Sequence, residues 1–341
     1  METYLSNSDG IENMRSRDYG FNLRQNTLLF MLENAVWPLF IVIYIVLGTI
    51  QPVIFSPNFF MYIIYLSVPL GFAILAQTIC LIGGVLDLSI GSIVGFSAMI
   101  AGVILKDSPL IPPPLSFILP IFFGLLCGLF NGYFIGFLRL NPFIVTLATM
   151  MALQGLKIIV AGGFTIPGGY LPEIYLFPGS NITFSIVSFL FTVVLVWIFL
   201  RYTRPGIHVY VVGGNQDVAH MMGVDPRKMI FLIFGISGMF AGISGLYYTG
   251  FNRSVPITLG NEVLFPTFAA AIISGVSLRG GRGNVLNVVG GALLLGVIEA
   301  FLVTFAVSPE ARIVGYGLMV LIAVLFNQFR DNIRDNLLRR I

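Results

Sequence analysis

Long apolar runs that carry almost no charge dominate this chain and limit what it can fold into. Ten such runs follow one another, and each is close to the length of about 20 residues with which an α-helix crosses a bilayer. They cover residues 37–55, 61–84, 86–105, 115–138, 143–161, 182–200, 229–250, 263–278, 284–305 and 313–328. Only 10% of the 341 residues are charged, against about 25% in soluble domains. The sequence therefore predicts an all-α polytopic membrane protein with about ten transmembrane helices.

The distribution of Lys and Arg predicts which way the helices cross the membrane. If the N-terminus is cytoplasmic, 14 of the 18 basic residues fall in inside loops and tails. The exceptions are Lys106, Lys157, Arg253 and Arg312. Basic residues collect on the cytoplasmic side, so we expect both termini in the cytoplasm. The chain then divides into a cytoplasmic N-terminal segment (1–36), a transmembrane domain (37–328) and a cytoplasmic tail (329–341).

The longest predicted inside loop, residues 201–228, carries the signature of a short helix. We expect Pro205 and Gly206 to end the sixth span and Gly214 to interrupt the chain again. Asn215 then follows as a good N-cap residue. Gly223 suits the position just beyond a helix C-terminus. A capped helix of about two turns is therefore predicted over residues 216–222.

This predicted helix has an apolar face. Val218, Met221 and Met222 stand three and four residues apart, which places them on one side of a helix. Asp217 lies in the first turn, where the helix dipole favours a negative charge. A helix this short is not stable alone, and Met adapts well to binding surfaces. Two interpretations follow: the helix lies on the membrane surface, or it enters a groove in a soluble partner.

Two Gly-rich breaks interrupt the apolar runs in similar ways. Residues 72–105 are broken by glycines, an Asp and two serines, and residues 267–302 are broken by a Gly-Gly-Arg-Gly turn. Paired interruptions in the two halves of a chain point to a transport pathway. Close packing of Gly-rich helices is the alternative explanation.

Two carboxylates stand among apolar residues, where a charge is costly and its presence suggests a function. Asp87 is either part of a pathway or gate, or the cap of a tight turn. Ser89 and Ser92 either line the same break or lie at helix–helix contacts. Glu299 lines a pathway, or it pairs with a buried donor. We expect Lys157 to extend its ammonium outward to the membrane surface.

The sequence lacks the residue motifs that several kinds of chemistry require. The lysines Lys106, Lys157 and Lys228 are not part of a phosphate-binding Gly-x-x-x-x-Gly-Lys-Ser/Thr loop. His208 and His220 have no neighbouring Cys or carboxylate at a metal-binding spacing. The net charge of +3 reflects loop arginines and does not indicate a nucleic-acid surface. We therefore expect no enzyme activity, no cofactor and no metal in this chain.

Four segments, in order along the chain, carry a resemblance to a known family. They are residues 84–92 (GVLDLSIGS), 141–151 (NPFIVTLATMM), 213–224 (GGNQDVAHMMGV) and 277–283 (SLRGGRG). They are similar to the GGIDLSVGS, PPFIVTL, GGN…A…SGI and SLxGGxG segments of the ribose-type permeases, the membrane subunits of bacterial ATP-binding-cassette importers for simple sugars. Val85, Pro266, Phe268 and Glu299 depart from the family pattern near the expected pathway. These departures leave the solute open among simple sugars, autoinducer-2, polyols and nucleosides.

The resemblance implies an inner-membrane permease that works with a cytoplasmic ATPase, an extracytoplasmic binding protein and a second permease copy. ATP and Mg would be bound by the ATPase. The implied ATPase-coupling residues are Gly214, Asn215, Asp217, Val218, Ala219, Met221, Met222 and Gly223. The expected pathway residues are Asp87, Ser89, Ser92, Asn141, Thr146 and Glu299, and the expected binding-protein contacts are Arg253 and Glu262. An ion-coupled secondary transporter, with Asp87 and Glu299 as its relay, is the alternative.

Overall fold

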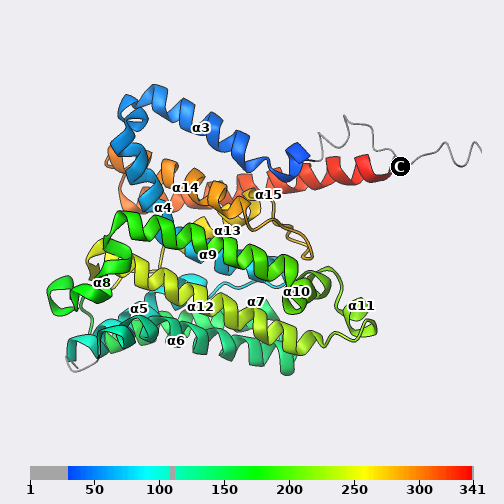
Figure 1. Cartoon of the computed structure of the whole chain (residues 1–341), viewed down its shortest axis with the longest axis horizontal. Coiled ribbons are helices and arrows are strands. Elements are labelled where there is room, and N and C mark those ends of the chain that lie inside the picture. The colour runs from blue at the N-terminus through cyan, green and yellow to red at the C-terminus, as the bar shows by residue number, and fades with distance from the viewer. Residues whose placement is uncertain (1–29, 108–111, 340–341) are drawn as a thin grey trace, which may run out of the picture.

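The computed structural model describes residues 30–107 and 112–339, and it is built almost entirely of α-helices (Figure 1). The helices are α3 (Val36–Ile50), α4 (Pro57–Ile82), α5 (Ile90–Asp107), α6 (Pro113–Gly132), α7 (Pro142–Val160), α8 (Glu173–Ser180), α9 (Ile182–Tyr202), α10 (Arg204–Gly214), α11 (Gln216–Met221), α12 (Pro226–Asn252), α13 (Leu264–Ile273), α14 (Asn287–Thr304) and α15 (Pro309–Arg339). Shorter elements are the 3₁₀ turns η1 (Pro52–Phe55) and η3 (Gly168–Tyr170), the π-helical turn η2 (Tyr133–Phe137), and the antiparallel strands β1 (Ile166–Pro167) and β2 (Ser254–Val255). Residues 1–29 of the predicted N-terminal segment and residues 340–341 of the predicted tail lie outside this description.

Eight of the described helices are long and apolar enough to cross a membrane. They are α4, α5, α6 together with η2, α7, α9, α12, α14 and α15. The shorter apolar helices α3 and α13 bring the total to the predicted ten, so the all-α polytopic fold is confirmed. The predicted span 263–278 contains a helix of only 10 residues, which is about 15 Å long. The predicted span 313–328 lies inside α15, which continues to Arg339.

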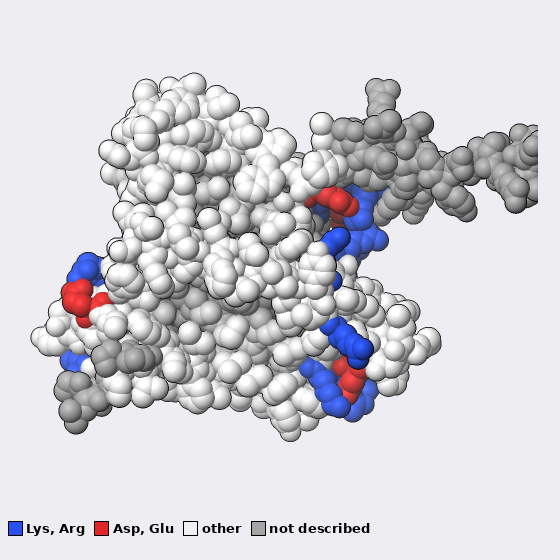
Figure 2. Space-filling model, in the orientation of Figure 1, with Lys and Arg blue, Asp and Glu red and all other residues white. Residues whose placement is uncertain are grey.

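The helices run roughly along the long axis of the molecule, with small elements at the two ends (Figure 1). One end carries α8, and we call it the α8 end. The other end carries α10, α11 and the end of the chain, and we call it the α11 end. Figure 2 shows Lys, Arg, Asp and Glu gathered at these two ends, with an uncharged band between them on the face in view. Such a band is what a bilayer requires of the surface that it surrounds.

The centre of the bundle is α12, the most buried span, with 72% of its most apolar stretch inside the protein. Its backbone lies directly against that of α6. A Cβ added at Gly128 would lie 2.1 Å from the carbonyl oxygen of Phe234, and one at Gly238 would lie 2.2 Å from that of Gly124. Small residues are the usual means of such close helix contacts in membranes. Substituting either glycine would force α6 and α12 apart.

A non-helical segment, residues 256–263, runs along α5 before α13 begins. A Cβ added at Gly91 would lie 2.5 Å from the carbonyl oxygen of Gly260, and one at Gly95 would lie 2.0 Å from that of Leu259. Since α5 is a membrane span, this places irregular backbone beside it at membrane depth. Such backbone is tolerated where it is packed against protein, as it is here.

Lys157 of α7 holds this segment in place. Its ammonium donates to the carbonyl oxygen of Leu259 at 2.8 Å and to Oδ1 of Asn261 at 3.0 Å. The residue is only 2% exposed. The prediction that Lys157 extends outward is therefore wrong, because one backbone carbonyl and one side-chain amide oxygen of the 256–263 segment attract the ammonium inward.

Candidate functional site

The short helix expected in the 201–228 loop is present as α11, at the α11 end of the molecule (Figure 1). Oδ1 of Asn215 accepts hydrogen bonds from the amides of Asp217 at 2.9 Å and Val218 at 3.0 Å, which caps the first turn. Gly223 follows the helix with a φ of 80°, a backbone conformation that suits glycine. The capping pattern in the sequence thus accounts for both ends of this helix.

The apolar face of α11 is open. Val218, Met221 and Met222 are 48%, 86% and 68% exposed, while Ala219 on the opposite side is fully buried. The helix has only six residues, with Met222 as its C-cap, and such a short helix needs packing to be stable. Its three exposed apolar side chains bury little of their surface against the rest of the protein. The described protein offers no cover for this face, so it is available to a partner or to the membrane surface.

A second helix in this loop, α10, is absent from the sequence-based expectations. Pro205 and Gly206 do not end the sixth span, because α9 already stops at Tyr202 and α10 begins at Arg204. Oγ1 of Thr203 accepts from the amide of Gly206 at 3.2 Å and caps the new helix. The available signal is a Thr two residues before a Pro, which is typical of a helix start.

The α10 helix rests on two turns that join membrane helices. The amide of Gly281 donates to the carbonyl oxygen of Ile82 at 2.8 Å. A Cβ added at Gly213 would lie 1.8 Å from that same oxygen, and one at Gly280 would lie 2.6 Å from Cα of Gly84. The two Gly-rich breaks of the sequence therefore meet each other under α10. One is the α4–α5 turn and the other is the α13–α14 connection.

Tyr210 adds a side-chain link from α10 to the same place. Its hydroxyl donates to the carbonyl oxygen of Gly283 at 3.1 Å. Burial raises the pKa of Tyr210, while the nearby Arg201 acts in the opposite direction. The hydroxyl therefore keeps its proton and stays a hydrogen-bond donor. Motion of α10 and α11 would be transmitted to both turns through these contacts.

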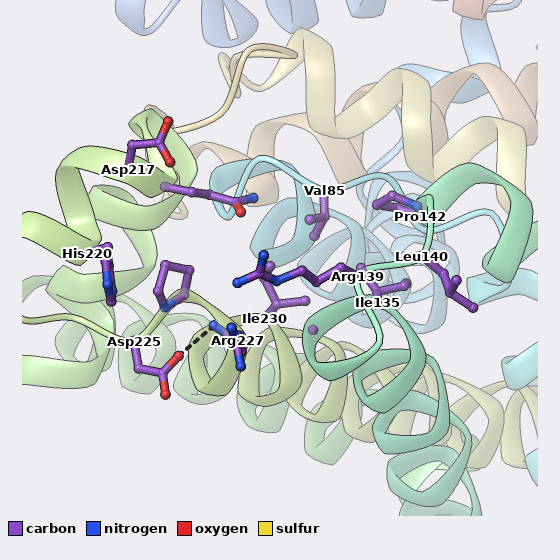
Figure 3. A pocket seen from close by; sticks show the side chains of 13 residues that line it. Val85, Ile135, Arg139, Leu140, Pro142, Asp217, His220, Asp225, Arg227 and Ile230 are labelled. Atoms are coloured by element: carbon purple, nitrogen blue, oxygen red, sulfur yellow. Dashed lines mark hydrogen bonds between the residues drawn. The ribbon is translucent and has the colours of Figure 1, made fainter.

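A cavity of about 610 Å³ opens beside α11 (Figure 3). It is lined by Val85, Ile135, Gly136, Arg139, Leu140, Pro142, Gln216, Asp217, His220, Asp225, Pro226, Arg227 and Ile230. Arg139 lies in the connection between η2 and α7, in a left-handed conformation with a φ of 56°. The sequence shows Arg139 only as a loop arginine. Its place in this cavity depends on the packing of η2 against the start of α12, which no local pattern reveals.

Asp87 is fully buried in the α4–α5 turn. Its Oδ1 accepts from the amide of Ser89 at 2.8 Å and from the hydroxyl of Ser89 at 2.5 Å. Ser237 of α12 donates to Oδ2 over a longer 3.4 Å. This geometry is that of a carboxylate that caps a turn and ties it to α12. A pathway or gate role for Asp87 stays a prediction.

Ser89 extends this network sideways into the bundle. Nδ2 of Asn131 donates to the hydroxyl oxygen of Ser89 at 2.8 Å, and Thr149 donates to Oδ1 of Asn131 at 2.6 Å. Ser92 instead donates to the carbonyl oxygen of Ser89 at 2.7 Å. Ser89 is thus linked to α6 and, through Asn131, to α7, whereas the hydrogen bond of Ser92 stays within the first turn of α5. These contacts match helix packing, which the sequence left open beside a pathway role.

Asn141 and Thr146 lie at the start of α7. Oδ1 of Asn141 accepts from the amide of Phe143 at 2.9 Å, which caps the helix. Thr146 donates to the carbonyl oxygen of Pro142 at 2.8 Å within its own helix. Both side chains have local structural partners, and their expected pathway roles stay predictions.

Glu299 of α14 borders a second cavity, of about 260 Å³. This cavity is lined by Leu66, Leu70, Tyr248, Asn252, Pro256, Thr258, Leu259, Gly260, Glu262, Val263, Pro266, Leu295, Gly296, Glu299 and Tyr316. Arg312 donates to one oxygen of Glu299 at 2.7 Å, and the Tyr316 hydroxyl donates to the other. Glu299 therefore lines a cavity and is also paired with donors. The sequence missed Arg312 and Tyr316, although an Arg beside an apolar run is a usable signal.

The two residues expected to meet a binding protein separate in the structure. Glu262 lines the same cavity as Glu299. Arg253 stands at the end of α12 and pairs with Glu173 of α8 at 2.5 Å, with both side chains more than half exposed. Arg253 thus pairs with α8 at the surface of the α8 end, while Glu262, also exposed, lines the mouth of the cavity.

Comparisons with known proteins match the chain over most of its length. It is 30% identical to the fructose import permease protein of Rhizobium meliloti over 328 residues, which is 91% of this chain and 91% of that protein. It is 27% identical to the ribose import permease protein of Haemophilus influenzae over 311 residues, 88% of this chain and 94% of that protein. It is 25% identical to the autoinducer 2 import system permease protein of an Enterobacter species over 314 residues, 88% of this chain and 91% of that protein.

No solved structure matches the chain. The resemblance to ribose-type permeases is confirmed by the relatives. The apolar helices and these relatives make the chain a multi-pass inner-membrane protein. A family model described as "branched-chain amino acid transport system / permease component" matches residues 59–325, and the chain belongs to this family of transport permeases.

Proposed function

We propose that this permease carries a simple sugar or a sugar-like solute into the cell, driven by a separate ATPase that docks on α11. The names of its relatives, which import fructose, ribose and autoinducer 2, support the solute class. The exposed Val218, Met221 and Met222 face of α11 is the observation that carries the docking proposal. In this proposal ATP and Mg stay in the ATPase, and the chain itself has no enzymatic activity.

The proposed orientation places the α11 end in the cytoplasm, together with both termini. Support comes from the basic residues, since Arg204, Arg227 and Arg279 all follow or precede helices at that end. Cytoplasmic loops are enriched in Lys and Arg. The α8 end, with Arg253 and Glu173, then faces the extracytoplasmic binding protein.

The proposed coupling runs through backbone contacts. Closure of the ATPase dimer would move α11 and the attached α10. Because Gly213 lies against Ile82 and the 277–283 turn, that movement would reach the α4–α5 and α13–α14 connections together. The first connection leads to α4 and the second to α13 and α14, and these three helices line the cavity of Glu262 and Glu299. Movement at one end of the molecule would thus change access at the other.

The cavity between the 256–263 segment and α14 suits a sugar. Its polar lining includes the carboxylates of Glu262 and Glu299, the hydroxyls of Tyr248 and Tyr316, and the amide of Asn252. Such groups bind hydroxyl-rich solutes through several hydrogen bonds. A volume of about 260 Å³ falls near the lower limit of small-ligand pockets, at about 300 Å³. We propose that this cavity is one segment of the pathway, completed by a second copy of the permease.

The docking proposal is tested by purifying the chain with its ATPase subunit in detergent. We expect co-purification with the native chain, and loss with Met222→Arg or Val218→Asp, because a charge would enter an apolar contact. Met222→Leu, which keeps the face apolar, is the matched control and should retain the ATPase. Equal recovery with all variants, or no ATPase with the native chain, would show that α11 is not the docking element.

The ion-coupled alternative makes a different prediction in vesicles. It requires Asp87 and Glu299 to relay a proton or sodium ion, yet Asp87 is tied to Ser89 and Glu299 to Arg312 in separate networks. We expect solute uptake to need the ATPase and ATP and to persist when ion gradients are collapsed. Uptake without ATPase that is abolished by Asp87→Asn would instead support ion coupling.

A further inference from the structure

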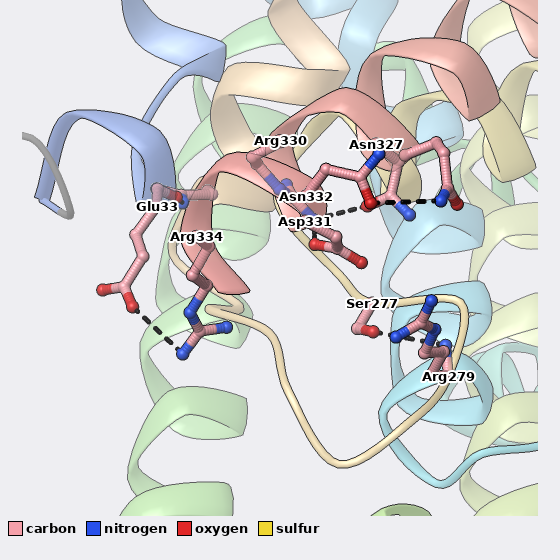
Figure 4. A network of polar contacts seen from close by, with 10 residues as sticks. Glu33, Ser277, Arg279, Asn327, Arg330, Asp331, Asn332 and Arg334 are labelled. Atoms are coloured by element: carbon pink, nitrogen blue, oxygen red, sulfur yellow. Dashed lines mark hydrogen bonds and ion pairs between the residues drawn. The ribbon is translucent and has the colours of Figure 1, made fainter. Parts of the chain in front are cut away.

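A third cavity lies at the α11 end, away from both sites discussed so far. It has a volume of about 220 Å³ and sits between the chain before α3, the 275–284 connection and α15. It is lined by Leu32, Glu33, Gly275, Ser277, Arg282, Gly283, Asn284, Arg330, Asp331 and Arg334. Figure 4 shows Glu33, Arg330, Asp331 and Arg334 converging there from two segments far apart in the sequence. Neither α11 nor the solute cavity shares these residues.

Arg330 is the unusual group in this cavity. Its side chain is only 7% exposed. Nη2 donates to Oδ1 of Asn327 at 2.5 Å, and the nearest carboxylate, that of Asp331, lies 3.6 Å away. Nη1 is buried and has no hydrogen-bond partner in the described protein. A buried guanidinium nitrogen without an acceptor is costly, so this position calls for an acceptor from outside the chain.

The charges of the cavity favour an anion. Three guanidinium groups, of Arg282, Arg330 and Arg334, face two carboxylates, of Glu33 and Asp331. Arg334 lies 3.6 Å from Glu33, which is too long for a good hydrogen bond. Arg282 has no side-chain partner among the residues that the structure describes. Guanidinium groups bind phosphate oxygens in pairs, and this arrangement leaves several of their N–H groups free.

The walls of the cavity are firmly built. Nδ2 of Asn287 donates to the carbonyl oxygen of Glu33 at 2.8 Å, and Nε1 of Trp37 donates to Oδ1 of Asn287 at 3.2 Å. Gly275 has a φ of 98°, and a Cβ added there would lie 3.1 Å from the Glu33 oxygen and 3.3 Å from Nη1 of Arg330. The glycine thus leaves the space in front of Nη1 open while the chain before α3 is held in place.

The surroundings are those of a membrane interface. Met31 and Phe329, the neighbours in sequence of lining residues, are 57% and 65% exposed. Trp37, which holds the cavity wall, is an aromatic residue of the kind found at the headgroup level. Exposed apolar side chains beside a basic cavity would contact acyl chains while the cavity holds a headgroup.

We propose that this cavity binds a phosphate group, held by Arg282, Arg330 and Arg334, with Nη1 of Arg330 as its buried donor. The phosphate could belong to the headgroup of an anionic phospholipid or to free phosphate, since both present the same oxygens. Basic pockets between membrane helices bind anionic headgroups in this way. The site holds the chain before α3 against α15, so its occupancy would stabilise both.

Native mass spectrometry of the full-length chain in detergent tests the proposal. The probes are dioleoylphosphatidylglycerol, dioleoylglycerol, which lacks the phosphate, and inorganic phosphate. The test variants are Arg282→Gln with Arg334→Gln, and separately Arg330→Lys, which keeps the charge. The matched control is Arg201→Gln, an exposed arginine at the same end of the molecule. A thermal unfolding curve of each variant shows that it is folded.

We expect one phosphatidylglycerol per chain and no binding of dioleoylglycerol. The double variant should bind at least about tenfold more weakly, because it removes two of the three guanidinium groups that would hold the phosphate, while Arg201→Gln should bind normally. If inorganic phosphate binds with the same dependence on the arginines and the lipid does not, the site takes phosphate from solution. Equal lipid binding by all variants, or no binding of either phosphate-bearing probe, overturns the proposal.

Discussion

The ammonium of Lys157 lies 2.8 Å from the carbonyl oxygen of Leu259, and no carboxylate of the described residues forms an ion pair with it. A single buried cation thus fixes the irregular segment that borders the cavity of Glu262 and Glu299. Its second acceptor is the side chain of Asn261, at 3.0 Å. Gly95 completes the arrangement, because the carbonyl oxygen of Leu259 lies where a larger residue would place its Cβ. The position of one cavity wall therefore depends on α5 and α7.

Replacing Lys157 by Met should loosen this wall. The Leu259 carbonyl would be left without its donor in a buried site, which costs about 1–3 kcal/mol. We expect a lower unfolding temperature in detergent and reduced solute uptake in vesicles. Lys106→Met is the control, since Lys106 is exposed at the end of α5. Equal unfolding temperatures for the two variants would contradict a stabilising role for Lys157.

Two adjacent glycines should respond very differently to substitution by Ala. At Gly213 the new Cβ would lie 1.8 Å from the carbonyl oxygen of Ile82, whereas at Gly214 it would meet nothing within 4 Å. Gly213→Ala must push α10 off the α4–α5 turn, at a cost of about 1–3 kcal/mol. We expect it to lower the unfolding temperature and to uncouple ATP hydrolysis from uptake. Gly214→Ala should leave the unfolding temperature near normal. A larger loss of stability with Gly214→Ala than with Gly213→Ala would refute the proposed contact.

Asn215 should be needed for the α11 helix, because its side chain caps two amides. Asn215→Ala removes both hydrogen bonds at a cost of about 0.5–2 kcal/mol. Asn215→Asp keeps an acceptor at the same position and is the matched variant. We expect weaker ATPase co-purification with Ala and near-normal recovery with Asp. Hydrogen exchange at the amides of Asp217 and Val218 measures the cap directly and should rise only with Ala.

The features that the sequence predicts correctly are those set by local chemistry. The apolar runs predict the eight span-length helices and the two shorter apolar helices of the described chain, since backbone in a membrane must satisfy its own hydrogen bonds. The cap at Asn215 and the left-handed Gly223 follow from neighbouring residues alone. For the same reason α11 was predictable to within a residue, and its open apolar face could be predicted from the spacing of Val218, Met221 and Met222.

What escaped prediction depends on contacts between distant segments. Lys157 turns inward because the 256–263 segment, about a hundred residues later, brings acceptors to it. Arg253 pairs with Glu173, which is 80 residues away in the sequence, and not with Glu262 of the loop that follows it. Gly84 lies directly against Gly280, so the two Gly-rich breaks of the sequence are in contact in the fold. No local pattern specifies which turn faces which.

The exposed pair of Arg253 and Glu173 offers a test of the proposed binding-protein contact. Pairs this exposed contribute at most about 1 kcal/mol to stability, so Arg253→Ala should unfold at nearly the native temperature. If Arg253 meets the binding protein, uptake should need a higher binding-protein concentration while the maximal rate is retained. Lys106→Ala, at the same end of the molecule, serves as the control. An unchanged concentration dependence would remove Arg253 from the contact.

Glu299→Gln should separate a pathway role from a purely structural one. The substitution keeps an acceptor for the Tyr316 hydroxyl but removes the charge that pairs with Arg312. Because both side chains are only about one-fifth to one-quarter exposed, loss of this charged hydrogen bond should cost about 1.5–3 kcal/mol of stability. An unpaired Arg312 beside the cavity should nevertheless slow uptake by about tenfold or more, which corresponds to about 1.4 kcal/mol in the barrier. Glu310→Gln, an exposed carboxylate at the start of α15, should leave uptake unchanged. Native uptake with Glu299→Gln would mean that the solute does not pass this cavity, whereas slow uptake by a variant that is still folded at the assay temperature would place Glu299 on its path.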